Sequence, residues 1–558
     1  MASVHAWPIS PSKTSRALAE RRTPNAERAS VQHRRRRHFN HRSRPRRATG
    51  SHALKVHFEP ATGVTLPQLV RALRAQPGVT SLGQHLEQRW YLETFDARLA
   101  AAKQVLSIAR GPHNATEIRL RTLASEATEC LTSAQALPKF AHDFRPGRVA
   151  LRLAQITLGR ALLPLAVGKL KVVRLRWQDA RGKLLAALQL EVGRGRQPPI
   201  ILRVSPLRGF EHTTQCALLP FLELGLVVPI KTDAAEHLLQ RLGLLRPPYT
   251  CKPVIPLRPK LPAAPALAQV LSAYTTSLRA NEWGVVADID SEFLHDYRVI
   301  LRCLRAWLSD LKTSLAPKPR EVLRVGLATL NRLTGELRDL DVLTGQLGSH
   351  LAHCADLPSP TTANEQLRAR LETARANAQT ALAAHLKSAA YRNFQRRWVG
   401  FLTAVAAGKH AGRDSEMPIR ALVRRAISKR HARILAFDPA LVDADPSALH
   451  ELRKDCKRLR YLLEGFQLLF ARNTVRQAVK ELKNLQGTLG DTWDLHVHLE
   501  LLSRLGAELP ATVPLMSALT QRLSLLEGQQ EALVVAALER FRSQQAQRHY
   551  ARLAGKTA

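Results

Sequence analysis

The amino-acid sequence predicts an α+β protein, in which an N-terminal antiparallel β-barrel is followed by an all-α helical bundle of two repeats. Three observations support this prediction. Segments of alternating apolar and polar residues occur between residues 51 and 245, and this period of two is typical of β-strands. A proline-rich stretch then ends the alternation. Beyond it, leucines recur at helical spacing, and a basic motif occurs twice.

Residues 1–50 differ from the rest of the chain and are expected to form a disordered leader. They contain twelve arginines, four of them consecutive at residues 34–37, and show no apolar periodicity. A segment with many like charges and few apolar residues buries too little surface to fold. The sequence leaves open whether this leader contacts polyanions or results from an early start codon.

Residues 51–245 are expected to form the β domain. Its alternating segments are 54–58, 105–109, 117–123, 172–177, 184–192 and 200–204. Seven prolines between residues 247 and 265 then predict a semi-rigid linker over residues 246–266.

The helical part contains the most informative pattern, a histidine-led basic motif whose two copies lie 155 residues apart. The copies read HDYRVILRCLR and HELRKDCKRLRY. Spacings of three, four and three residues place the histidine and the three cations of each copy on one helix face. The matched pairs are His295 and His450, Arg298 and Arg453, Arg302 and Lys457, and Arg305 and Arg460.

The opposite face of each motif helix is apolar and is expected to pack in the core. It carries Leu301, Leu304, Leu308 and Leu311 in the first copy, and Leu452, Leu459, Leu462 and Phe466 in the second. A solvated helix face interleaves acidic and basic side chains, but these cationic stripes are nearly free of acids. The pattern therefore favours an anionic partner over a merely solvated face.

The two motifs resemble those of the CHAD domain, the conserved-histidine α-helical domain. Each is followed by a second family element, LTGELRDLDVL in the first repeat and LKNLQGTLGDTWDLHV in the second. With an offset of 152 residues, Gly335 matches Gly487, Leu337 matches Leu489, Asp339 matches Asp491, and Ala328 and Asn331 take the places of Lys480 and Lys483. The domain is expected over residues 267–550, with repeats of about 267–410 and 411–550.

The resemblance implies a basic channel that binds inorganic polyphosphate, and an association with polyphosphate granules. Polyphosphate has about one negative charge per phosphate and no bases, so repeated cations are sufficient to recognise it. The two histidines are expected either to donate to phosphate or to position the chain. The implied binding residues are His295, Arg298, Arg302, Arg305, Arg338, His450, Arg453, Lys454, Lys457, Arg458, Arg460, Lys480 and Lys483.

Composition limits the partners to polyanions, namely polyphosphate, nucleic acid or an anionic membrane surface. The 558 residues contain 84 Lys and Arg against 45 Asp and Glu, which gives a formal net charge of +39. Aromatic residues are only 5% of the chain, so the stacking platforms of single-stranded nucleic-acid binders are scarce, and nucleic acid is expected to bind only non-specifically.

Six cysteines without a CxxC pair indicate a reduced cytoplasmic protein without structural zinc. The longest apolar stretch, residues 217–230, is interrupted by charge and proline and is too short to span a bilayer.

The β domain resembles the CYTH domain, the triphosphate tunnel fold. The resemblance lies in WYLETFDARLAAAKQVLSIAR, EIRLRTL and RLRWQDARGKLLAALQLEVG. Alternation places Glu117, Arg119 and Arg121 on one strand face, and Arg174 and Arg176 on one face of another strand. Inside a closed barrel, these four arginines would face phosphate.

The acidic strand of that family, Glu-x-Glu-x-Lys, has no counterpart here. The nearest segment supplies only Lys55, His57 and Glu59, and the remaining acids Glu117 and Glu191 are either metal ligands or partners of adjacent arginines. We therefore expect a degenerate tunnel that uses no cofactor. The alternative is a metal-dependent inorganic triphosphatase, which would need Mg²⁺ and would use the helical domain to bind its substrate.

Overall fold

The computed structural model describes residues 56–111, 116–122, 128–133, 137–194, 198–241, 249–351, 360–444, 446–506 and 513–555. The expected leader, residues 1–50, lies outside these residues. The chain divides into two units at residues 51 and 52, and all described residues belong to the second unit. No helix in the described ranges combines the length and the apolar character needed to cross a bilayer.

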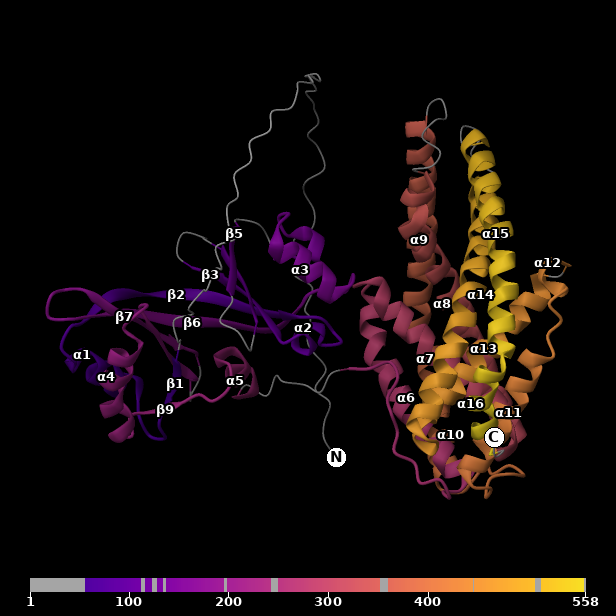
Figure 1. The fold of residues 1–558 in the computed structure, drawn as a ribbon, viewed down its shortest axis with the longest axis horizontal. Coiled ribbons are helices and arrows are strands. Elements are labelled where there is room, and N and C mark those ends of the chain that lie inside the picture. The colour runs from indigo at the N-terminus through magenta and orange to yellow at the C-terminus, as the bar shows by residue number, and fades with distance from the viewer. Residues whose placement is uncertain are drawn as a thin grey trace. The chain divides into compact units, whose positions relative to one another are not determined.

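The N-terminal part is an antiparallel sheet, as predicted. Its strands are β1 (Val56–Pro60), β2 (Val79–Glu93), β3 (Gln104–Arg110), β4 (Thr116–Thr122), β5 (Thr128–Ser133), β6 (Leu163–Gln178), β7 (Leu184–Val192), β8 (Ile200–Pro206) and β9 (Val227–Pro229). The strand order is β5-β4-β3-β2-β6-β7-β8-β1-β9 (Figure 1). The six predicted segments correspond to β1, β3, β4, β6, β7 and β8, whereas β2, β5 and β9 were not predicted.

Helices and the sheet enclose the core of this part. The helices are α1 (Leu66–Ala75), α2 (Arg98–Ala101), α3 (Arg148–Thr157), α4 (Glu211–Glu223) and α5 (Ala234–Arg241). Alternate side chains of β6, β7 and β8, such as Leu175, Leu190 and Val204, pack in one cluster with Leu69 of α1 and Phe221 of α4. The sheet also curls, because β4 and β8 line one cavity although four strands separate them in the sheet order.

The C-terminal part is all-helical, also as predicted. It contains α6 (Ala263–Val286), α7 (Ser291–Asp310), α8 (Pro317–Leu351), α9 (Pro360–Lys387), α10 (Ala389–Ala406), α11 (Ile419–Leu435), α12 (Leu441–Ala444), α13 (Pro446–Gly465), α14 (Arg472–Gly506), α15 (Val513–Arg542) and α16 (Gln544–Leu553). The long helices α8, α9, α14 and α15 pack side by side (Figure 1). They share a leucine cluster with members such as Leu343, Leu367, Leu502 and Leu519.

The two repeats keep one offset of 155 residues throughout their motif helices. Helix α7 begins and ends 155 residues before α13, and α8 begins and ends 155 residues before α14. The offset of 152 expected for the second element is therefore wrong: Gly335 corresponds to Gly490, Asp339 to Asp494, and Val325 and Ala328 to Lys480 and Lys483.

Close packing explains why Gly490, and not Gly487, is the counterpart of Gly335. A Cβ at Gly335 would lie 3.1 Å from Nη1 of Arg298, and one at Gly490 would lie 3.8 Å from Nη2 of the matched Arg453. Each glycine lets the guanidinium of its own repeat approach the helix backbone, which Gly487 does not do.

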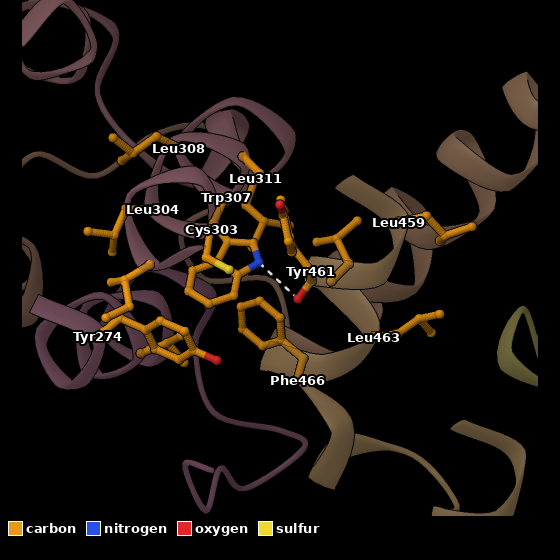
Figure 2. Packing of buried hydrophobic residues seen from close by; sticks show 14 of the residues in the cluster. Tyr274, Cys303, Leu304, Trp307, Leu308, Leu311, Leu459, Tyr461, Leu463 and Phe466 are labelled. Atoms are coloured by element: carbon orange, nitrogen blue, oxygen red, sulfur yellow. Dashed lines mark hydrogen bonds between the residues drawn. The ribbon is translucent and has the colours of Figure 1, made fainter. Parts of the chain in front are cut away.

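The apolar faces of α7 and α13 meet in the core, where Trp307 joins the two repeats. Its Nε1 donates to the backbone oxygen of Tyr461 at 3.3 Å, and its ring contacts Tyr274 and Phe466 edge-on (Figure 2). Gly465 lies against this ring, since a Cβ there would come within 2.2 Å of it. The eight predicted core residues of the two motifs are all buried. The cationic faces thereby point away from the core.

Candidate functional site

Helices α7, α8, α13 and α14 line a cavity of about 520 Å³, which we call the helical cavity. Its lining contains nine Lys and Arg side chains and two aspartates. The lining residues are His295, Arg298, Arg302, Arg305, Ala306, Ser309, Arg324, Asn331, Arg338, Asp339, Val342, His450, Arg453, Lys454, Lys457, Arg458, Tyr461, Asp494, Val497 and His498. Both repeats thus contribute their motif face to one cavity.

Four lining cations are paired with carboxylates. Arg453 donates to Asp494 at 2.9 Å, across from α13 to α14. Arg458 contacts Asp310 at 2.8 Å, and this aspartate also holds Arg430 in the core. Two further pairs each lie within a single helix: Lys454 with Glu451 in α13, and Arg324 with Glu321 in α8. These pairs neutralise part of the lining before any ligand enters.

The other five lining cations make no ion pair with a carboxylate in the described part of the chain. They are Arg298, Arg302, Arg305, Arg338 and Lys457. Arg298 donates only to Thr334 Oγ1 and the backbone oxygen of Asn331, at 3.3 and 3.4 Å. The Nε atoms of Arg302 and Arg305 are buried without a hydrogen-bond partner among the described residues. A water molecule or an oxygen of an anionic ligand satisfies a donor of this kind.

Burial and the crowding of these cations lower the pKa of several lining residues. Burial, with Arg302 next, lowers the pKa of Arg298 to about 10. Burial and then Arg453 and Arg302 lower the pKa of Lys457 to about 7. His295 and His450 both have a pKa lowered to about 4, mainly by burial and then by neighbouring cations. At neutral pH both histidines are therefore neutral and offer an N–H donor rather than a charge.

A second cavity, of about 250 Å³, lies in the N-terminal part, and we call it the sheet cavity. Its polar lining residues are Arg89, Tyr91, Ser107, Arg119, Arg121, Gln189, Glu191, Arg203 and Ser205. Arg119 and Arg121 line it, as expected for phosphate-facing positions. Arg174 and Arg176 do not: both are exposed, and Arg176 donates to Thr80. The long strand β6 carries these two arginines beyond the curled part of the sheet.

The arginines of the sheet cavity are held by carboxylates. Arg89 is buried and donates to Glu191 at 2.6 Å, and Glu191 in turn lies 3.4 Å from Arg203. Arg119 pairs with Glu117, and Arg121 pairs with Asp233 at the start of α5. Although burial alone would raise it, the pKa of Glu191 falls to about 2 because Arg89 is adjacent.

These pairs also bear on the metal that the tunnel resemblance raised as an alternative. Glu117 and Glu191 are partners of arginine, and Glu59 pairs with His237 and Arg241. The described residues contain no group of three or more His, Cys, Asp or Glu side chains that could hold a metal ion. The acids in and near the sheet cavity are already paired with basic side chains, so the cavity does not fit a divalent metal ion.

Comparison with known proteins identifies the helical part. The sequence model of the CHAD domain matches residues 269–503. These residues form a CHAD domain. The fold is similar to the crystal structure of the CHAD domain from the plant Ricinus communis, with 23% identity and a TM-score of 0.44 over 52% of this chain and 95% of that chain. PptA from Streptomyces chartreusis is also similar, with 18% identity and a TM-score of 0.38 over 51% of this chain and 99% of that one.

The N-terminal part aligns with a different group of structures. One is the putative adenylyl cyclase HpAC1 from Hippeastrum, for which a dominant triphosphatase activity is named, at 15% identity and a TM-score of 0.25 over 35% of this chain and 98% of that chain. That activity is a property of the Hippeastrum protein. No curated protein matches the chain.

Ten of the thirteen cationic and histidine residues predicted from the CHAD resemblance line the helical cavity, and three do not. Lys480 and Lys483 are exposed on α14 and lie outside the lining. At the offset of 155 they match Val325 and Ala328, which do not line the cavity either. Arg460 matches Arg305 but lies over the ring of Tyr461, with Glu464 3.9 Å away.

Sequence reasoning missed several lining residues of the CHAD domain. Arg324 lies nine residues, about two and a half helical turns, before the recognised second element, so no motif marked it. Asp494 was present in the second repeat's element, but the offset of 152 assigned the place of Asp339 to Asp491 instead, and His498 follows directly after that element. An alignment anchored on Gly335 and Gly490 would have found the matched aspartates.

Proposed function

We propose that the CHAD domain binds inorganic polyphosphate in the helical cavity, and that the protein associates with polyphosphate granules through this binding. The observation that carries the proposal is the set of five lining cations without a carboxylate partner, contributed by both repeats. A folded protein retains such a set at a cost in self-repulsion, and a polyanion relieves that cost.

The chemistry of the lining fits polyphosphate better than nucleic acid. Four of the five unpaired cations are arginines, whose forked donors match the terminal and bridging oxygens of phosphate. The lining contains one aromatic residue, Tyr461, and its ring is buried in the core. Bases would therefore find no stacking platform there, whereas a chain of phosphates needs none.

The sheet cavity supports a second candidate, an inorganic triphosphatase, only through its arginine lining. Its arginines are already paired with carboxylates, and its acids do not make a metal site in the described residues. We therefore propose binding, and not hydrolysis, as the activity.

The test is a calorimetric titration of the full chain with long-chain polyphosphate at fixed salt, with single-stranded DNA of equal charge as competitor. We expect tight binding that the DNA displaces poorly, and an affinity that falls steeply as salt is raised, because counterions are released. Displacement by DNA at equal charge would reduce the cavity to a general polyanion surface. Release of orthophosphate from triphosphate with Mg²⁺ would instead support the second candidate.

A further inference from the structure

Lys457 faces charged groups from every element that lines the helical cavity. On α7 and α8 these groups are His295, Arg298, Arg302, Arg338 and Asp339. On α13 and α14 they are Arg453, Lys454, Arg460, Tyr461, Asp494 and His498. Cations outnumber carboxylates in this environment, and Asp494, the carboxylate that acts on Lys457, already accepts from Arg453.

The amine of Lys457 is the cation in this cavity that most readily gives up its charge. An arginine keeps its proton at any physiological pH, whereas a buried lysine loses its proton easily. The matched position in the first repeat is Arg302, so the two repeats differ at this point only in whether the cation can be discharged. Burial and the cations Arg453 and Arg302 lower the pKa of Lys457 to about 7, so the empty cavity holds a partly neutral amine at neutral pH.

We propose that polyphosphate binding is coupled to the uptake of one proton by Lys457, so that affinity decreases as the pH rises above neutrality. This inference rests on the proposed function of the same cavity. Phosphate oxygens beside Lys457 offset the repulsion of its cationic neighbours and favour the ammonium form. The proton comes from the solvent, and no bond in the ligand is formed or broken.

The sign and size of the effect follow from linkage. A bound anion raises the pKa of Lys457, so protonation strengthens binding and binding strengthens protonation by the same factor. With a pKa of about 7 in the empty cavity, the affinity should fall by about fivefold from pH 7 to pH 8. From pH 8 to pH 9 the fall should approach about tenfold, the limit for one proton taken up per binding event. His295 and His450 start from a pKa of about 4 in the empty cavity, so a bound anion must raise their pKa by far more than that of Lys457 before they take up a proton in this range.

The experiment compares the full-length protein with Lys457→Arg at pH 7, 8 and 9 and constant ionic strength, by calorimetric titration with long-chain polyphosphate. Each titration is run in two buffers of different ionisation enthalpy, so that the number of protons taken up is measured directly. We expect proton uptake and the pH dependence in the wild type, and the loss of both in Lys457→Arg, because its guanidinium keeps its proton over this range. The exposed Lys409→Arg is the matched control and should behave as the wild type.

A second variant keeps the test decisive if the arginine does not fit. Lys457→Gln should bind at pH 7 about as weakly as the wild type at pH 9, with a flat pH profile. Tight binding of polyphosphate with equal affinity from pH 7 to 9 and no buffer-dependent heat would overturn the inference and leave the proposed function standing. Absence of binding at every pH would overturn the proposed function itself.

Discussion

The helical cavity and the sheet cavity are both lined by arginines, but they balance this charge in opposite ways. In the sheet cavity Arg89, Arg119 and Arg121 each have a carboxylate partner within hydrogen-bonding distance. In the helical cavity five of the nine lining cations have none among the described residues. We therefore expect the affinity of a cavity for anions to depend on how many of its cations lack a carboxylate partner, and not on its number of arginines.

The difference also separates two uses of a buried charge. In a buried ion pair, the arginine and the carboxylate compensate each other's charge, and removal of one partner leaves an uncompensated charge in the interior. Cations without carboxylates are instead held apart by the scaffold and destabilise it slightly, and a ligand reverses that cost. By this argument, changes in the sheet cavity should affect stability, and changes in the helical cavity should affect binding.

The largest effect is expected from charge reversal in the helical cavity. Arg453→Glu combined with Lys457→Glu should lower polyphosphate affinity by well over tenfold, because charge-assisted contacts contribute about 1.5–3 kcal/mol each. Titration calorimetry measures the loss, and the unfolding temperature checks that the variant is folded. Arg397→Glu with Lys409→Glu changes the net charge equally at two exposed positions outside the cavity. An equal loss in that control would mean that overall charge, and not the cavity, binds the ligand.

A large effect on stability is expected in the sheet cavity. Glu191→Gln leaves the buried Arg89 with Glu87 as its remaining acidic partner, and should lower the free energy of unfolding by about 3 kcal/mol. Because the pKa of Glu191 is held at about 2, below its ordinary value, its contribution is present above pH 4.5 and is lost as the pH falls toward 2. Urea unfolding at pH 7 and at pH 3 measures both effects.

Glu117→Gln is the matched control for this substitution. Its pair with Arg119 is partly exposed, with 37% and 28% of the two side chains accessible, so its loss should cost no more than about 1 kcal/mol. Polyphosphate affinity should stay unchanged in both variants. A drop in affinity with Glu191→Gln would show that the two cavities are not independent, and would contradict the comparison.

The sequence was sufficient for the architecture because periodicity reflects burial directly. The leucine faces of α7 and α13 and the alternation in β4 and β7 each report one buried face. Strand β2 escaped prediction because the side chains of residues 80–84 are exposed and mostly polar, and its buried half, which includes Arg89, Trp90 and Tyr91, does not alternate. Its long pairing with β6 is tertiary information that no local pattern contains.

The candidate site was predictable in its first element and less so in its second. The histidine-led motifs have one spacing in both copies, so their offset was read correctly. In the second element, a shift of three residues still aligns a glycine, a leucine and an aspartate. Local matching alone, without the offset of 155 from the first element, does not choose between the two offsets. The packing of Arg298 on Gly335 and of Arg453 on Gly490 makes that choice in three dimensions. The sequence also could not predict that a lining cation pairs with an acid far away in the chain, as Arg121 does with Asp233.

The smallest effect is expected at the two lysines that the CHAD resemblance had implied as binding residues. Lys480 and Lys483 are exposed on α14 and do not line the helical cavity, so they contribute only to the long-range field of the protein. Lys480→Gln with Lys483→Gln should change polyphosphate affinity by about twofold or less at 0.15 M salt, where charges farther apart than roughly 8 Å are screened. Arg298→Gln with Arg302→Gln, which removes the same number of charges from the lining, should weaken binding by well over tenfold. Similar losses in the two double variants would mean that the ligand also follows α14 outside the cavity, and would extend the binding surface beyond the five unpaired cations.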